Sequence, residues 1–177
     1  MNATRYNLLT IFLHWITALA VVGLFALGLW MDGLGYYDAW YQKAPHIHRS
    51  IGLLLAGLII LRLIWRQVTT LPAPLDNHKP WERLSAKATH WLLYGLLLLI
   101  FVSGYLISTA KGKPIEVFNW FSVPSLISGV DNLEDLSGEI HELAAFSVIG
   151  LTLLHAAAAL KHHFIDRDRT LLRMFGK

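Results

Sequence analysis

Histidine is the residue type in this chain whose positions offer the most chemistry. His141 and His155 enclose thirteen residues that carry a single charge, on Glu142. In a helix, fourteen steps advance about 21 Å and stop about 40° short of four full turns, so both imidazoles face nearly the same way. Imidazole is the commonest protein ligand of metal ions and also exchanges protons near neutral pH. One apolar helix therefore holds two potential ligands on one face, one near each side of a bilayer core about 30 Å thick.

Two further histidines lie at depths that match this pair. His14 lies six residues into an apolar run that begins at Leu8, roughly 9 Å from its start. His155 precedes the far end of its own run by about ten residues, so it can meet His14 in one half of the membrane. His48 and His141 each open an apolar run from the opposite side, so they can meet in the other half. The sequence thus predicts two stacked histidine pairs.

Pairs of neutral imidazoles limit the choice of bound group. Zinc usually takes three or four protein ligands, and a histidine-rich copper site stays open as an alternative. The chain has no cysteine, which excludes disulfides, thiolate-bound metal, iron–sulfur clusters and covalent haem attachment. Two histidines from different helices suit axial ligation of haem iron. Such a site favours electron transfer over oxygen binding, because no coordination position stays open.

Three other histidines compete with these four or add to them. His46 lies two residues before His48 and could replace it if its helix starts earlier. His90 lies nearer the membrane surface than His14 in the same half, which favours an interfacial role or a contact with a haem propionate. His78 falls in a proline-containing connection and is predicted to be a solvated loop residue.

A further pair of histidines follows the last apolar run. His162 and His163 follow His155 by seven and eight residues, so His162 returns to the same helix face about 10 Å further on. A protonatable hydrogen-bond donor at that level could serve a quinone headgroup. A pair of interfacial side chains that reach toward water is an equally good interpretation.

Four apolar runs must position these histidines. The predicted helices cover about 8–30, 48–65, 88–109 and 140–165. About 20 residues span a bilayer, so three runs are long enough and the second needs its polar ends to reach the interface. The chain is 55% hydrophobic and 15% charged, against about 25% charged residues in soluble domains. We therefore predict one domain, 1–177, an all-α membrane protein folded as an antiparallel four-transmembrane-helix bundle.

The distribution of Lys and Arg predicts the orientation. Eleven of the fifteen lie on the side that holds both termini and the second connection. The positive-inside rule places that side, and both termini, in the cytoplasm. The other, outer side has four Lys and Arg against eight Asp and Glu, so it is net acidic.

Several motifs carry a resemblance that spans essentially the whole chain. They are R-Y-x(7)-H-W at 5–15, H-R-S-I-G at 48–52, I-H-E at 140–142, L-H-A-A-A-A-L-K-H-H-F at 154–164 and D-R-T-L-L-R-M at 168–174. With these motifs the chain resembles the bacterial cytochrome b561 family, the small four-helix di-haem membrane cytochromes. The resemblance implies that the matching histidines ligate two b haems. It pairs His14 with His155, and His48 with His141. The depths of these residues in the membrane predict the same pairs.

The resemblance also implies a function. The family exchanges electrons with ubiquinone, and one member takes electrons from periplasmic superoxide and passes them through its haems to quinone. We therefore expect a multi-pass protein of the bacterial inner membrane that transfers electrons between a periplasmic-side donor and ubiquinone. Superoxide is the leading candidate donor, which would make the chain a superoxide:ubiquinone oxidoreductase. No nucleic-acid partner is expected.

The outer charges depart from that expectation. Superoxide is an anion, and a positive surface would steer it, whereas the outer side is net acidic. Arg49, Lys111 and Lys113 could form a local basic patch beside the outer haem, or could pair with haem propionates. The alternative function is a non-catalytic haem b electron-transfer subunit for a partner dehydrogenase or hydrogenase-type complex. A haem-free packing or transport protein is the remaining alternative.

Overall fold

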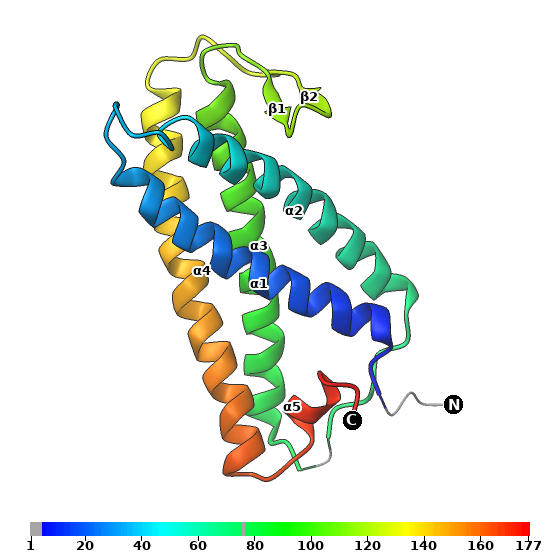
Figure 1. The fold of residues 1–177 in the computed structure, drawn as a ribbon. Helices are drawn as coiled ribbons and strands as arrows, with labels where there is room; N and C mark the ends of the chain where they lie inside the picture. Colours follow the sequence, from blue (N-terminus) through cyan, green and yellow to red (C-terminus); the bar gives the residue numbers. More distant parts are fainter. Residues whose placement is uncertain (1–4, 76) are drawn as a thin grey trace.

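Four long helices and one short helix form the computed structural model, which describes residues 5–75 and 77–177. The helices are α1 (Leu8–Asp32), α2 (Lys43–Val68), α3 (Pro80–Thr109), α4 (Leu133–Phe164) and α5 (Thr170–Arg173). Each of the first four is long and apolar enough to cross a membrane, which confirms the predicted number of spans. They run alternately up and down, so the start of α1 and the C-terminus lie at one end (Figure 1). We call that end the terminal end and the opposite one the hairpin end.

Three of these helices begin earlier than the hydropathy predicts. The structure starts α2 at Lys43, α3 at Pro80 and α4 at Leu133, rather than near 48, 88 and 140. Hydropathy marks the part of a helix that lies in lipid, whereas the backbone stays helical through polar turns beyond it. Proline at the first helical position is favoured because its missing N–H would have no partner there. The earlier starts place His48 and His141 well inside their helices instead of at their first turns.

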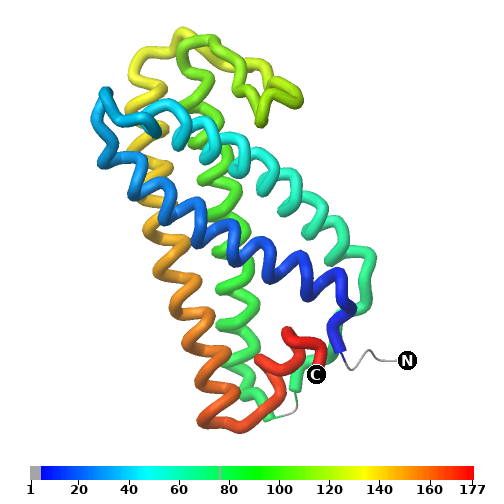
Figure 2. Tube along the Cα trace, in the orientation of Figure 1, coloured from blue at the N-terminus to red at the C-terminus, as the bar shows by residue number. Residues whose placement is uncertain are grey.

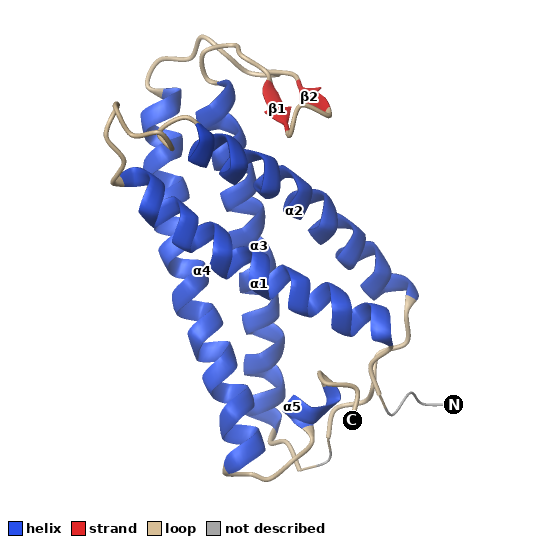
Figure 3. Ribbon diagram, viewed as in Figure 1, coloured by secondary structure: helices blue, strands red, loops and turns tan. Residues whose placement is uncertain are grey.

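A small β-hairpin caps the hairpin end and adds a feature that an all-α prediction lacks. Strands β1 (Ile115–Val117) and β2 (Phe121–Val123) pair antiparallel in the connection between α3 and α4 (Figure 3). The turn places Phe118 and Asn119 at φ 47° and 60°. Tight hairpin turns with two positive φ values usually contain Asn-Gly or Asp-Gly, so this one gave no sequence signal.

The buried hydroxyl of Ser50 fixes this hairpin over α2. Its Oγ accepts from Phe118 N at 3.1 Å and donates to Glu116 O at 3.4 Å. Ser50 is fully buried and lies two residues after His48. The hairpin is therefore fixed to α2 within one turn of His48, one of the predicted ligands.

The helices pack as two pairs. Contacts are extensive between α1 and α2 and between α3 and α4, and sparse between the two pairs. In the tube view α1 and α2 diverge from α3 and α4 toward the terminal end, where α5 lies (Figure 2). The indole of Trp15 in α1 donates to Met174 O at 2.8 Å, which ties the tail to α1. The two helix pairs are thus joined by few direct contacts.

An apolar layer joins the two pairs near mid-height. Its buried residues are Leu55, Ile59, Leu97 and Val148. Val148 lies seven residues after His141 and seven before His155. This apolar layer therefore lies between His141 and His155 along α4. His141 is on the side of the hairpin end and His155 on the side of the terminal end.

Candidate functional site

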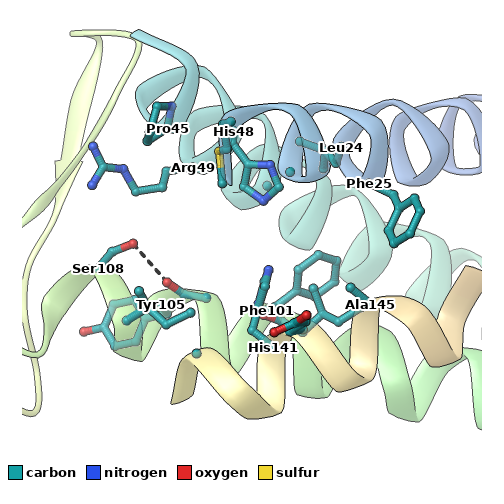
Figure 4. Close-up of a pocket in the computed structure, with 18 of the residues that line it drawn as sticks. Leu24, Phe25, Pro45, His48, Arg49, Phe101, Tyr105, Ser108, His141 and Ala145 are labelled. Carbon is teal, nitrogen blue, oxygen red and sulfur yellow. Dashed lines mark hydrogen bonds between the residues drawn. The ribbon is translucent and has the colours of Figure 1, made fainter. Parts of the chain in front are cut away.

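His48 and His141 face one another at the hairpin end. Their ring centroids lie 6.2 Å apart with an interplanar angle of 67°. Both side chains project into one cavity of about 630 Å³, lined by residues of all four long helices and of β1 (Figure 4). Cofactor pockets typically measure about 300–1,000 Å³. The cavity is therefore large enough for a cofactor, and its walls are mostly apolar.

The backbone of α3 orients the ring of His141. Its Nδ1 lies 3.0 Å from Ile100 O and 3.2 Å from Ser103 Oγ. A carbonyl oxygen can only accept, so Nδ1 carries the proton and Nε2 keeps its lone pair. Metal-binding histidines usually show this arrangement, because the second hydrogen bond fixes the tautomer and raises the basicity of the ligand.

Two glycines leave room for the facing rings. A Cβ on Gly104 would stand 3.0 Å from His141 Cε1, tighter than most real contacts, so the ring would have to shift by a few tenths of an ångström. A Cβ on Gly28 would stand 3.5 Å from His48 Cε1, an ordinary contact. His48 Nδ1 is buried and has no hydrogen-bond partner within 5–75 and 77–177. The hairpin-end cavity thus holds one oriented imidazole, that of His141, and one, that of His48, whose Nδ1 has no partner among the described residues.

His14 and His155 form the second pair, at the terminal end. Their ring centroids lie 6.4 Å apart with an interplanar angle of 62°. A metal–imidazole bond is about 2 Å long and the nitrogen lies about 1 Å from the ring centre, so rings on opposite sides of one ion have centroids about 6 Å apart. Both pairs have this spacing. Four histidines from α1, α2 and α4 therefore fit two groups that each bind two imidazoles.

The terminal-end pair has two close neighbours, His90 and Arg62. The ring of His90 lies 5.3 Å from that of His155, so His90 is nearer the pair than its predicted interfacial position. Arg62 Nη2 lies 3.0 Å from His14 Nδ1, and the guanidinium also lies 5.8 Å from the ring centre of Tyr94. Among the described residues no carboxylate forms an ion pair with Arg62. This half-buried cation suits an anionic group bound beside His14.

The three predicted basic contacts all line the hairpin-end cavity. They are Arg49, Lys111 and Lys113. Lys111 Nζ lies 2.6 Å from Glu134 Oε2, and this hydrogen-bonded ion pair raises the pKa of Lys111. Arg49 and Lys113 have no ion-pair partner in the part of the chain that the structure describes. Those two cations are better placed than Lys111 to meet an anion in the cavity.

His46 and His48 differ in what they face. His46 lies against Phe118 of the hairpin, with ring centroids 6.3 Å apart, whereas His48 faces His141. Although the helix does start earlier, as the alternative required, its rotation turns His46 toward the hairpin. The geometry therefore favours His48 as the partner of His141.

The histidines beyond His155 lie in unlike surroundings. His162 Nδ1 lies 2.8 Å from Asp166 Oδ2 and 3.1 Å from Asp168 Oδ2. His163 packs on Phe164 with ring centroids 4.8 Å apart, and its Nδ1 is buried without a partner among the described residues. Of these two histidines, His162 is the one that lies in a polar cluster.

His78 also belongs to this cluster, so its prediction as a solvated loop residue is wrong. Its side chain is 16% exposed, and its Nε2 lies 3.0 Å from Asp168 Oδ2. Burial alone would raise the pKa of Asp168, but hydrogen bonds from Thr170 and His78 and the charge of His162 outweigh it and lower that pKa to about 2. The ionised carboxylate of Asp168 binds the ring of His78 and keeps it largely buried. The composition of the connection around His78 does not reveal this tertiary contact.

Comparison with known proteins agrees with this architecture. A model of the prokaryotic cytochrome b561 family matches residues 5–177. The chain is 50% identical over 173 residues to cytochrome b561 homolog 2 of Escherichia coli K12, covering 98% of this chain and 92% of the relative. It is 30% identical to cytochrome b561 homolog 1 of the same organism, over 98% of both chains. It is 29% identical to a protein of Yersinia pestis named probable superoxide oxidase CybB, over 98% of this chain and 97% of the relative. The family predicted from the motifs is confirmed: the chain belongs to the prokaryotic cytochrome b561 family of haem-containing membrane electron carriers.

Proposed function

We propose that the chain carries electrons across the bacterial inner membrane, from a donor at the hairpin end to ubiquinone at the terminal end. His48 and His141 would hold one b haem, and His14 and His155 a second. The observation that carries this proposal is the pair of facing imidazoles at each level, both spaced for one metal ion. The haems would supply one-electron redox chemistry.

The orientation follows from the charges and is part of the proposal. The terminal end carries most of the Lys and Arg, so it would face the cytoplasm and the hairpin end the periplasm. The donor would then meet the cavity under the hairpin, and quinone would be reduced where cytoplasmic protons are available.

The surrounding residues would hold and tune the two sites. Ile100 O fixes the tautomer of His141, and the apolar layer around Val148 would keep water out between the two histidine levels. Arg49 and Lys113 would pair with the carboxylates of the haem at the hairpin end, and Arg62 with those at the terminal end. These cations would also favour the reduced form of the nearby group by electrostatic attraction.

Superoxide is the proposed donor. Each superoxide loses one electron and leaves as dioxygen, and two electrons with two protons convert one quinone to quinol. The relative named probable superoxide oxidase supports this choice at 29% identity over nearly the whole chain. His162 and His163 would donate hydrogen bonds or protons to the quinone at the terminal end.

The acidic hairpin-end surface favours a second candidate. Eight Asp and Glu against four Lys and Arg on that side would repel an anion and suit a basic redox partner. In that case the chain would be a haem b subunit that serves a partner dehydrogenase or hydrogenase-type complex and would not oxidise superoxide by itself.

Rapid mixing separates the two candidates. Oxidised, purified protein is mixed with superoxide and the reduced haem bands are followed. Reduction near the diffusional range of about 10⁸ M⁻¹s⁻¹ supports the superoxide donor, and no reduction contradicts it. A visible spectrum with a pyridine haemochrome count comes first, with two b haems per chain as the expected result. Lack of a Soret band would contradict both candidates.

Gly104→Ala should disturb the hairpin-end site. The added methyl would stand 3.0 Å from His141 Cε1, and the ring cannot withdraw without stretching its hydrogen bond to Ile100 O. We expect a shifted α band and partial loss of one haem, measured by reduced-minus-oxidised spectra and haem content. The matched control is Gly28→Ala, whose methyl makes an ordinary 3.5 Å contact with His48. Equal behaviour of the two variants would contradict the role of Gly104.

Arg62→Gln should lower the midpoint potential of the terminal-end haem. Removing a half-buried cation beside His14 destabilises the reduced state by an amount on the order of tens of millivolts. Spectroelectrochemical titration measures both potentials. Arg66→Gln, one turn further along α2 and exposed, is the control. A shift no larger than that of the control would argue against Arg62 as the partner of a haem carboxylate.

A further inference from the structure

A polar cluster at the terminal end lies apart from both facing pairs. It brings together His78 from the connection between α2 and α3, His162 from the last turn of α4, and Asp166 and Asp168 from the tail. The ring centroids of His78 and His162 lie 4.5 Å apart, with the ring planes inclined by 40°. The side chains of His78, His162 and Asp168 are only 16%, 13% and 6% exposed. Three separate segments thus bring together largely buried side chains of types that bind metal ions.

The potential ligand atoms converge closely. Asp168 Oδ2 lies 3.0 Å from His78 Nε2 and 3.1 Å from His162 Nδ1. One potential ligand atom from each of the three residues lies within 4.8 Å of the other two. Ligands of a tetrahedral zinc ion, with bonds of about 2.0–2.2 Å, lie about 3.3–3.6 Å apart. The ligand atoms would therefore need to move apart by only a few tenths of an ångström to make room for the ion. A further oxygen, Asp166 Oδ2, lies 2.8 Å from His162 Nδ1.

The state of His162 distinguishes this cluster from an ordinary hydrogen-bonded network. Its Nδ1 is buried and close to two carboxylate oxygens, yet no described residue forms a hydrogen bond of acceptable geometry with it. Buried polar atoms in folded proteins nearly always have a partner. A cation placed among these atoms would use the lone pair of Nδ1 and the charge of Asp168 together.

We propose that His78, His162 and Asp168 bind a zinc ion, with the fourth position open to water. Two imidazole nitrogens and one carboxylate suit zinc, whereas magnesium and calcium prefer oxygen ligands. The ion would tie the tail and α5 to the connection before α3. It does not depend on the haem assignments and shares with the proposed function only His162, a candidate quinone contact.

Zinc chloride added to the purified, haem-loaded full chain tests this directly. Isothermal titration in a non-chelating buffer should show one zinc per chain, and His78→Gln should weaken binding at least about tenfold. Asp168→Asn, which keeps the shape of the side chain, should do the same. His46→Gln removes a histidine at the hairpin end and should bind zinc as the unmodified chain does. Absent binding, or equal binding by His78→Gln and the unmodified chain, would overturn the proposal.

A second measurement tests whether zinc protects the tail that follows α4 from proteolysis. Zinc should slow tryptic cleavage after the exposed Arg167 and Arg169 in the unmodified chain and not in Asp168→Asn. The haem bands of each variant show whether it is folded, so a misfolded variant is recognised. Zinc protection that persists in Asp168→Asn would contradict the site. Failure of the haem assignment would show in the spectrum instead, whatever the zinc result.

Discussion

Replacing His155 with alanine is expected to halve the haem content of the purified protein. His155 faces His14 at the terminal end, and the apolar layer around Val148 separates it from the other pair. The remaining haem should keep the spectrum of a bis-histidine site, because its two ligands are untouched. Haem content by pyridine haemochrome and the reduced α band measure the loss. Superoxide should still reduce the remaining haem, whereas electrons should no longer reach quinone.

Comparison with two further variants tests the pairing itself. The ring of His90 lies 5.3 Å from His155, nearer than the 6.4 Å of His14. We expect His14→Ala to lose the same haem as His155→Ala, and His90→Ala to keep both. The reverse result would make His90 the ligand, and retention of both haems in His155→Ala would refute the terminal-end site.

Replacing His141 with alanine should remove the other haem and with it the reaction with the donor. His141 is the imidazole whose tautomer is fixed by Ile100 O, and it faces His48 in the cavity beneath the hairpin. Without this ligand the first electron acceptor is missing, so reduction by superoxide should fall to the background rate in rapid mixing. His46→Ala is the control and should keep both haems and the full rate.

Chemical rescue sharpens the second prediction. In His141→Gly the space of the ring is vacated, and added imidazole can reach the same carbonyl of Ile100 within a cavity of about 630 Å³. Imidazole should restore the bis-imidazole spectrum and part of the reduction rate. An unchanged spectrum at saturating imidazole, with the second haem intact, would speak against His141 as an axial ligand.

The predicted ligands show what local patterns specify. The four apolar runs predict four spans, since about 20 apolar residues are needed to cross a bilayer whatever the neighbours are. The spacing of His141 and His155 depends only on helical rise and rotation, so the two levels follow from the chain alone. Depth then predicts a partner for each, and the structure brings His48 near one and His14 near the other.

The sequence by itself thus determined the family, the four spans and two levels of paired histidines. The tertiary structure alone decided that Arg62 meets His14, that Gly104 admits the ring of His141, that Ser50 fixes the hairpin, and that His78 joins His162 and Asp168. The reason is that lipid-facing and protein-facing sides of a membrane helix are both apolar. Hydropathy therefore marks where each helix lies but not how it is rotated, and rotation determines which side chains meet.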